Sequence, residues 1–221
     1  MNIIIQARAS SKRLPNKVLI KINEKNLLEY LIDRLNYSRF KNQIYIATST
    51  NKKDDQIEDL CREKNIKFYR GSLQNVFMRF VDLIKFFKLN SFIRICADSP
   101  MMDPRILDKA ISLFKFNNFD IVTNKFPRSY PKGQTVEIIK SEIFLNSINL
   151  VETLEEKEHV TLHLYKYHKL FKIKNFLSSN DLSKKNLSID TKTDFKNFKK
   201  YLKKNDYFLG NKTHKKILLN Y

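Results

Sequence analysis

Residues 3–17 of the chain read IIIQARASSKRLPNK. The first part, Ile3–Gln6, predicts a buried strand, because consecutive β-branched residues favour extended backbone. The loop that follows carries four cations, two hydroxyls and no acid up to Lys17. In open α/β sheets, ligands bind beyond the carboxyl ends of the strands. This loop is therefore the first candidate for a binding site.

The composition of the loop favours phosphate binding. It lacks both GxxxxGK[ST] and GxGxxG, but Arg supplies a planar fork and Lys a compact charge for a polyphosphate. A lysine-rich chain also produces such loops as plain solvated surface. Two observations count against that alternative. Two of the ten arginines, Arg8 and Arg13, lie in this loop. Pro15 also stiffens the loop, and an inert linker does not need a stiff backbone.

Outward from this stretch, short β-rich runs alternate with helical patterns up to residue 125. The expected strands are Ile3–Gln6, Ile44–Thr48, Lys67–Tyr69, Phe92–Ile95 and Ile121–Thr123. The expected helices are Leu27–Leu35, Asp54–Glu63, Val76–Phe87 and Arg105–Phe116. This alternation predicts an α/β fold with a mainly parallel, Rossmann-like sheet and helices on both faces.

The regular alternation ends near Phe126. The expected elements after it are a polar loop at Pro127–Gly133, strands at Val136–Ile139, Phe171–Asn175 and Leu187–Ile189, and helices near Glu142–Leu150 and Glu155–Tyr167. No repeat or low-complexity linker interrupts the chain. Residues 1–221 are therefore expected to form a single domain.

The net charge invites a different interpretation. The 221 residues hold 42 Lys+Arg against 23 Asp+Glu, a formal net charge of +19, as in many nucleic-acid-binding or membrane-binding proteins. Lys outnumbers Arg 32 to 10, however, and the abundance of Lys, Asn and Ile, which have A/T-rich codons, favours a biased genome as the source of the excess. Within residues 165–221, Phe195, Phe198, Tyr201 and Leu202 predict an amphipathic helix with a solvated lysine face. We therefore expect neither a nucleic-acid nor a membrane partner.

Other whole-chain features favour a cytoplasmic protein. The longest apolar run is Ile44–Ala47, too short for a membrane span, and the N-terminus lacks the pattern of a signal peptide. Cys61 and Cys96 provide neither a disulfide framework nor a four-ligand metal set. His159 and His163 have i, i+4 spacing, but no Glu follows His159 as a zinc-protease helix requires.

Two carboxylates are candidates for metal binding. Asp98 and Asp190 each follow an apolar strand, so both should emerge at the same sheet edge. Two aspartates plus phosphate oxygens satisfy Mg²⁺. Either aspartate could instead be a helix-capping residue. Arg94, within a strand, either reaches the site or forms a structural ion pair.

Six further short motifs lie downstream of the first loop. They are Ile46–Thr50, Tyr69–Ser72, Arg94–Pro100, Tyr130–Gly133, Glu158–Thr161 and Ile189–Thr191. Together with Ile4–Leu19, they resemble the cytidylyltransferase family, which includes SpsF-type spore-coat proteins and the synthetases of CMP-sialate and CMP-3-deoxy-manno-octulosonate. The resemblance covers about residues 2–200. It implies a nucleotide-diphospho-sugar transferase type of fold, with a nucleotide-binding half (1–125) and an acceptor and dimerisation half (126–221).

The resemblance also implies roles for particular residues. The catalytic set would be Arg8, Arg13, Lys17 and Asp98, with Asp98 and Asp190 holding Mg²⁺. The nucleotide-binding set would be Gln6, Ala7, Arg8, Ser11, Arg13, Lys17, Thr48, Ser49, Arg70 and Arg94. The implied reaction transfers CMP from CTP to an acidic, nonulosonate-like sugar for surface-polysaccharide synthesis, with release of pyrophosphate, in a homodimer.

Departures from the family pattern limit what carries over. Asn16 replaces a frequent Gly, although Asn tolerates the same left-handed backbone. Gln134 and Thr135 stand where SpsF-type proteins often have Leu and Asp, so a carboxylate is lost on the acceptor side. A phosphonate or phosphocholine-like acceptor therefore stays open. A related glycosyltransferase is the other alternative, disfavoured because no Asp-x-Asp motif ends a strand.

Overall fold

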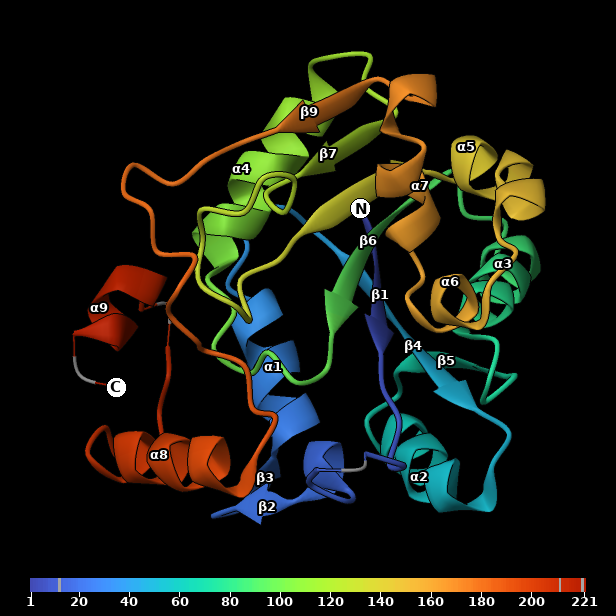
Figure 1. Cartoon of the computed structure of the whole chain (residues 1–221). Helices are drawn as coiled ribbons and strands as arrows, with labels where there is room; N and C mark the ends of the chain where they lie inside the picture. Colours follow the sequence, from blue (N-terminus) through green and yellow to red (C-terminus); the bar gives the residue numbers. More distant parts are fainter. Residues whose placement is uncertain (12, 211, 220) are drawn as a thin grey trace.

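The computed structural model describes residues 1–11, 13–210, 212–219 and 221. Within them, seven strands form one sheet in the order β5-β4-β1-β6-β8-β7-β9 (Figure 1). These strands are β1 (Asn2–Gln6), β4 (Gln43–Ser49), β5 (Lys67–Gly71), β6 (Ser91–Cys96), β7 (Ile121–Thr123), β8 (Glu137–Lys140) and β9 (Ile173–Asn175). A separate antiparallel pair joins β2 (Lys21–Ile22) to β3 (Lys25–Asn26).

The central sheet is mainly parallel, as the alternation of elements predicts. Strands β5, β4, β1 and β6 run parallel to one another, and β7 runs parallel to β9. Strand β8 is antiparallel to both of its neighbours, β6 and β7. Its first residue, Glu137, therefore lies opposite Arg94 of β6, near the edge where β1 and β6 end.

Most helices lie close to the expected positions, but the one at His214–Leu218 was not expected, and the helix expected near Glu142–Leu150 ends at Asn146 and is followed by a 3-10 turn. The helices are α1 (Leu27–Leu35), α2 (Asp55–Glu63), α3 (Val76–Phe86), α4 (Pro104–Lys115), α5 (Ser141–Asn146), α6 (Leu154–Glu158), α7 (Leu162–Lys166), α8 (Lys192–Lys203) and α9 (His214–Leu218). Short 3-10 turns are η1 (Lys17–Leu19), η2 (Lys52–Asp54), η3 (Ile148–Leu150) and η4 (His168–Leu170). Helix α1 begins with a capping box between Asn26 and Glu29.

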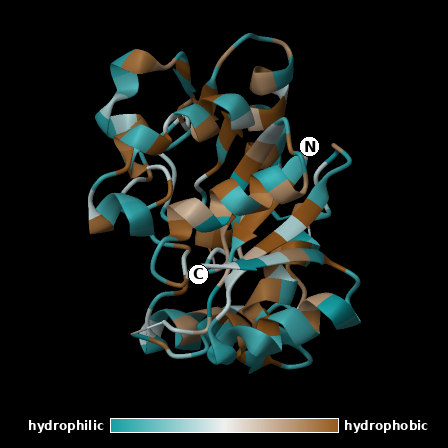
Figure 2. Ribbon diagram, turned by 90° about the vertical axis from the view of Figure 1, so that its right-hand side faces the viewer, coloured by the Kyte–Doolittle hydropathy of each residue, from teal (hydrophilic) through white to brown (hydrophobic). Residues whose placement is uncertain are grey.

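Helices cover both faces of the sheet (Figure 1). Ile3 and Ile5 of β1 pack with α1, α2 and α4 on one face, whereas Ile4 packs with α3, α5 and α7 on the other. Because side chains alternate along a strand, β1 is apolar on both sides. Figure 2 shows the resulting hydrophobic colouring of the sheet and the more polar outer surfaces of the helices. A third cluster packs α8 and α9 against Tyr30 of α1.

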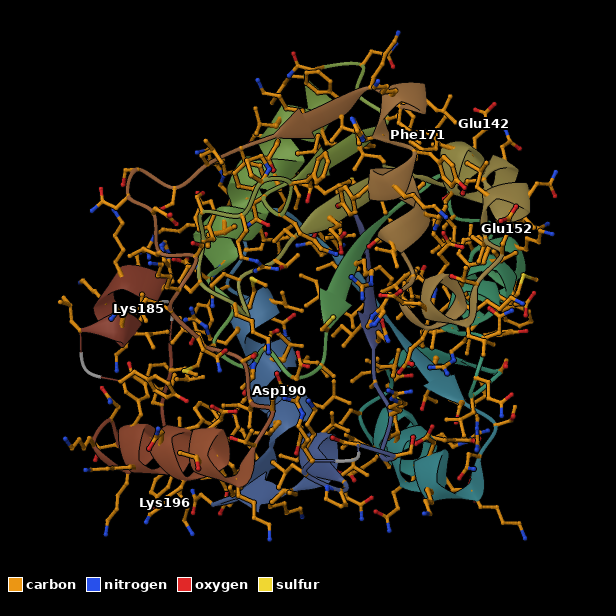
Figure 3. The ribbon with its side chains drawn as sticks, viewed as in Figure 1. Glu142, Glu152, Phe171, Lys185, Asp190 and Lys196 are labelled. Atoms are coloured by element: carbon orange, nitrogen blue, oxygen red, sulfur yellow. The ribbon has the colours of Figure 1, made fainter. Side chains whose placement is uncertain are left out.

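The lysine-rich helix also agrees with its predicted pattern. Phe198, Tyr201 and Leu202 of α8 are buried, while Lys196 and Lys203 are exposed. Figure 3 labels Lys196 on the outer side of α8. Among the residues that the structure describes, no helix has both the length and the apolar composition needed to cross a membrane.

Two further expected elements differ. Leu187–Ile189 is not a strand: Leu187 donates to the Lys132 carbonyl and Ile189 to the Asp98 carbonyl, so the segment joins two loops instead of the sheet. The expected helix Glu155–Tyr167 is divided into α6 and α7, with a non-helical turn at His159. After that turn, the Thr161 hydroxyl donates a buried hydrogen bond to Glu137. A continuous helix is therefore not formed.

Candidate active site

A cavity of about 390 Å³ opens beside the ends of β1 and β6. Its lining residues are Gln6, Arg8, Ser11, Arg13, Lys17, Val18, Cys96, Ala97, Asp98, Glu158, His159 and Asp190. It therefore brings together the basic loop after β1, the residues after β6, the turn between α6 and α7 and the segment before α8. Seven residues of the candidate site line it together: Gln6, Arg8, Ser11, Arg13, Lys17, Asp98 and Asp190.

Lys17 connects the two aspartates. Its Nζ donates to Asp98 Oδ2 at 3.2 Å and to Asp190 Oδ1 at 2.8 Å. Asn16 precedes η1 with φ 55°, so it adopts the left-handed backbone that its substitution for Gly requires. Burial alone would lower the pKa of Lys17, but Asp98 and Asp190 raise it above its usual value. The ammonium is therefore a fixed positive charge at the centre of the site.

Asp190 has ionic contacts with three cationic side chains. Besides Lys17, it binds Lys132 Nζ through Oδ2 at 2.5 Å and has Arg13 at 3.3 Å from Oδ1. Burial would raise the pKa of Asp190, but the hydrogen bonds from Lys132 and Lys17 hold it well below the usual value. Asp190 is therefore an ionised carboxylate. Figure 3 labels it on the segment that leads into α8.

The backbone on either side fixes Asp190 in place. Thr191 caps α8 and forms a capping box with Asp194, whose carboxylate also accepts the N–H of Asp190 at 3.0 Å. Gly133, at φ +85°, packs so closely that an added Cβ would lie 2.6 Å from the Ser188 nitrogen. A side chain larger than hydrogen at position 133 would therefore displace the segment that carries Asp190.

Arg8 contacts the opposite wall of the site. Its Nη2 donates to Glu158 Oε1 at 2.8 Å, at the C-terminal end of α6. Both side chains are partly exposed, so Arg8 can exchange this partner for a phosphate. Arg13 is more exposed still. The loop thus presents cations that are held near the cavity without being buried.

A buried polar network lies beneath the cavity. Arg94 donates through Nη1 to Glu137 Oε2 at 2.5 Å and through Nη2 to Gln6 Oε1 at 3.1 Å. Glu137 also accepts hydrogen bonds from Thr161 at 2.8 Å and Tyr165 at 2.7 Å. Burial would raise the pKa of Glu137, but chiefly the charges of Lys125 and Arg94 lower it to about 2. Arg94 therefore forms the ion pair that the sequence left as one of two alternatives.

Other candidate residues lie outside the cavity lining. Ala7 continues the pairing of β1 by donating to the Ala47 carbonyl at 3.1 Å. Thr48 and Ser49 are buried at the end of β4, where the Ser49 hydroxyl donates to Asp54. Arg70 pairs with Asp55 and Glu58 of α2 at 2.6 and 2.5 Å. Arg70 thus ties β5 to α2 in this structure.

Three contacts of the site were not anticipated from the sequence. They are the pairing of Lys132 with Asp190, that of Glu158 with Arg8, and the bond from the Ala9 N–H to Asp54 Oδ1 at 2.7 Å. From the sequence, Asp54 is predicted only as the start of a helix. No pattern in the neighbouring sequence indicates that Asp54 is buried beside the cation-rich loop. Lys132 and Glu158 lie within the motifs Tyr130–Gly133 and Glu158–Thr161, and these motifs are the part of the sequence that indicated a site there.

The carboxylates suit a hard divalent cation. Asp98 and Asp190 already share one cation, the Lys17 ammonium, and carboxylate oxygens are the ligands that Mg²⁺ prefers. In the described part of the chain no three His, Cys, Asp or Glu side chains gather as a metal site. Mg²⁺ would therefore need phosphate oxygens as further ligands. His163 is committed elsewhere, since its Nε2 contacts Ser147 Oγ at 2.8 Å.

Comparisons with known proteins point to the same kind of site. A family described as cytidylyltransferase matches residues 2–217. The spore coat polysaccharide biosynthesis protein SpsF of Bacillus subtilis (strain 168) is 32% identical over 205 residues, covering 89% of this chain and 83% of that protein. An 8-amino-3,8-dideoxy-manno-octulosonate cytidylyltransferase of Shewanella frigidimarina is 30% identical over 120 residues, covering 52% of this chain and 47% of that protein.

A solved structure shows the same fold over nearly the whole chain. It is described as a cytidylyltransferase from Leptospira borgpetersenii and superimposes with a TM-score of 0.91 at 27% identity. The superposition covers 99% of this chain and 92% of that one. The similarity therefore extends through the segment that carries Asp190.

Proposed function

The chain belongs to the cytidylyltransferase family, and from that premise we propose that it transfers CMP from CTP to an acidic, nonulosonate-like sugar. Pyrophosphate is the second product, and the activated sugar serves surface-polysaccharide synthesis. The observation that carries the proposal is the joint contact of Lys17 with Asp98 and Asp190, beside a loop of cations. A triphosphate and a divalent cation need these groups together.

The loop after β1 would bind the triphosphate. Arg8, Ser11 and Arg13 line the cavity and supply two guanidinium groups and a hydroxyl. Lys17, which is largely buried and permanently charged, would lie nearest the bond that breaks. Backbone groups of Gln6 and Ala7, with Thr48, Ser49 and Arg70 further along the edge, would border the cytidine.

The reaction needs an in-line displacement. A hydroxyl oxygen of the acceptor attacks the α-phosphorus of CTP, the bond to the bridging oxygen breaks, and pyrophosphate leaves with the electron pair. The proton of the hydroxyl passes to water. Mg²⁺, when held by Asp98 and Asp190, would neutralise charge on the phosphate oxygens. Lys17 and Arg13 would contribute fixed positive charge to the same oxygens, which is where charge develops in the transition state.

Sequence relatives support an acidic sugar as the acceptor. The Shewanella relative acts, by its name, on an amino-dideoxy-octulosonate, and the Bacillus relative is named for polysaccharide biosynthesis. We assign the acceptor to the half formed by residues 126–221, which contributes Glu158, His159 and Asp190 to the lining.

A nucleotide-by-acceptor screen tests the proposal. Pyrophosphate release is measured with CTP, UTP, ATP and GTP, each with a nonulosonate, 3-deoxy-manno-octulosonate, a phosphonate, phosphocholine and a neutral hexose. We expect release only with CTP, an acidic sugar and Mg²⁺ together. Asp98→Asn is the negative control, and Asp59→Asn on the exposed face of α2 is its matched partner. Turnover confined to the phosphonate or phosphocholine would replace the acidic sugar by that acceptor.

We further propose that the protein acts as a homodimer in the cytoplasm, where CTP is available. The half formed by residues 126–221 exposes large apolar side chains, including Leu154 at 82% and Leu170 at 66% exposure. Light scattering after size exclusion measures the mass in solution. A dimer that Leu170→Asp dissociates, and that Phe116→Asp in the other half leaves intact, supports an interface on this half, whereas a wild-type monomer refutes it.

A further inference from the structure

The orientation of one amide in the cavity is fixed by its neighbour. Gln6 Oε1 accepts a hydrogen bond from Arg94 Nη2 at 3.1 Å. A guanidinium has donors only, so the oxygen of the amide must face Arg94. The nitrogen of Gln6 is therefore the end of the amide that Arg94 does not hold, in a residue that lines the cavity. That nitrogen carries two N–H donors.

Arg94 has little freedom to release that amide. Its Nη1 pairs with Glu137, a fully buried carboxylate. Glu137 is held in turn by Thr161 and Tyr165, each through a buried hydrogen bond. Because a buried charge that loses its partner is strongly destabilising, the network favours a single arrangement. Gln6 is therefore oriented before any ligand binds.

The network lies on the acceptor side of the site. The side chain of Gln6 is drawn toward β6 and β8, away from β4 and β5, where the proposed nucleotide residues Ser49 and Arg70 lie. Glu137, which anchors the network, belongs to the half that contributes the α6–α7 turn to the cavity wall. The loop cations that suit the triphosphate are separate from this network.

We propose that Gln6 is a specificity-determining residue whose Nε2 donates a hydrogen bond to the carboxylate of the acceptor, and that Arg94 is the residue that positions it. This inference rests on the proposed function. A site that hydrogen-bonds an oxygen of its substrate discriminates strongly against analogues that lack it, because its own polar group is then left unpaired. The Gln6 amide would thus select acidic sugars over neutral ones.

Two substitutions of Gln6 test the contact. Gln6→Glu keeps the oxygen that Arg94 binds but replaces the donor by a second oxygen, so it repels an acidic acceptor. Gln6→Met keeps the size and removes the donor without adding charge. We expect the KM for the acidic sugar to rise about tenfold or more in Gln6→Glu and less in Gln6→Met, with the KM for CTP within about twofold. Gln43→Glu, an exposed glutamine at the start of β4, is the matched control.

Arg94→Lys tests the positioning role. A lysine ammonium can keep the ion pair with Glu137, but it lacks the planar guanidinium that contacts Glu137 and Gln6 at the same time. The acceptor KM should rise while the KM for CTP and the thermal midpoint stay close to wild type. An unchanged acceptor KM would refute the positioning role.

The outcomes separate this inference from the proposed function. The wild-type protein is assayed first, and no turnover of any acidic sugar means that the proposed function is wrong. In an active protein, an unchanged acceptor KM in both Gln6 variants means that Gln6 does not contact the acceptor. Equal rises in both KM values, or a rise for CTP alone, assign Gln6 to the nucleotide and overturn the inference.

Discussion

Lys17 Nζ lies 2.8 Å from Oδ1 of Asp190, a residue 173 positions further along the chain. The same ammonium also contacts Asp98, so it holds in one place two carboxylates that the fold brings from separate loops. Two carboxylates this close would repel each other without a cation between them. The lysine therefore holds the two carboxylates close together, where they could share a metal ion.

Replacing Lys17 should remove most of the activity. Lys17→Met takes a fixed charge from the phosphate end of the site, and losing one such donor typically lowers kcat by about 10²–10³-fold. Lys17→Arg should retain more, since it keeps the charge. The measurement is kcat for pyrophosphate release, with Lys21→Met, an exposed lysine of β2, as the control. Full activity in Lys17→Met would remove the lysine from the mechanism.

Asp98 and Asp190 should set the requirement for Mg²⁺. EDTA should abolish turnover and added Mg²⁺ should restore it. The described residues offer no third protein ligand beside the two carboxylates, so a chelator should remove the ion easily. Asp98→Asn and Asp190→Asn should each raise the Mg²⁺ concentration for half-maximal rate by about tenfold or more. Asp59→Asn should behave as wild type. Turnover that persists in EDTA contradicts the metal assignment.

His163 should make stability depend on pH. Burial lowers its pKa to about 4, and its Nδ1 has no hydrogen-bond partner within the residues described. An unfolded histidine titrates near 6.5, so between pH about 6.5 and 4 the unfolded chain binds the additional proton. Lowering the pH through this window therefore destabilises the fold, by about 2 kcal/mol between pH 7 and 4.5.

Urea unfolding at several pH values measures this effect. In His163→Gln the decline across that window should be much smaller than in wild type. His168→Gln removes an exposed histidine and should leave the decline unchanged. If both variants decline like the wild type, His163 is not its source.

Local patterns were enough to predict most of the fold. The helix expected at Leu27–Leu35 coincides with α1, because its apolar spacing and its Asn26–Glu29 capping box lie within a few residues. The strand at Ile3–Gln6 is likewise set by its own β-branched residues. Leu187–Ile189 has the same apolar composition but pairs with Lys132 and Asp98 carbonyls, and no local pattern distinguishes these partners from a neighbouring strand.

The site was predictable in part for the same reason. Asp98 and Asp190 do lie together on Lys17, but only Asp98 follows a strand of the sheet. Asp190 reaches the same place on a loop segment that is bonded to the carbonyls of Lys132 and Asp98. Lys132 binds Asp190 across 58 positions, and Glu158 binds Arg8 across 150. Such contacts depend on how loops pack after the sheet has formed. Charge and spacing in the sequence carry no information about which partner each will find.

Gly133→Ala should disturb Asp190 from a distance. Gly133 has φ +85°, which disfavours any Cβ, and the new methyl would meet the backbone of Leu187 and Ser188 at 2.6–2.8 Å. That backbone leads directly to Asp190, so the clash should move the carboxylate away from Lys17. We expect a lower thermal midpoint together with a fall in kcat and a weaker response to Mg²⁺.

Gly210→Ala separates the two effects. Gly210 also has a positive φ, +54°, but the atoms nearest to a Cβ there belong to the side chain of Phe208. Phe208 is largely exposed and lies outside the cavity lining. This variant should lose stability through its backbone while its folded fraction keeps the kcat and the Mg²⁺ dependence of the wild type. If Gly133→Ala shows the same pattern, with stability reduced and kcat per folded molecule unchanged, the turn at Gly133 does not position Asp190.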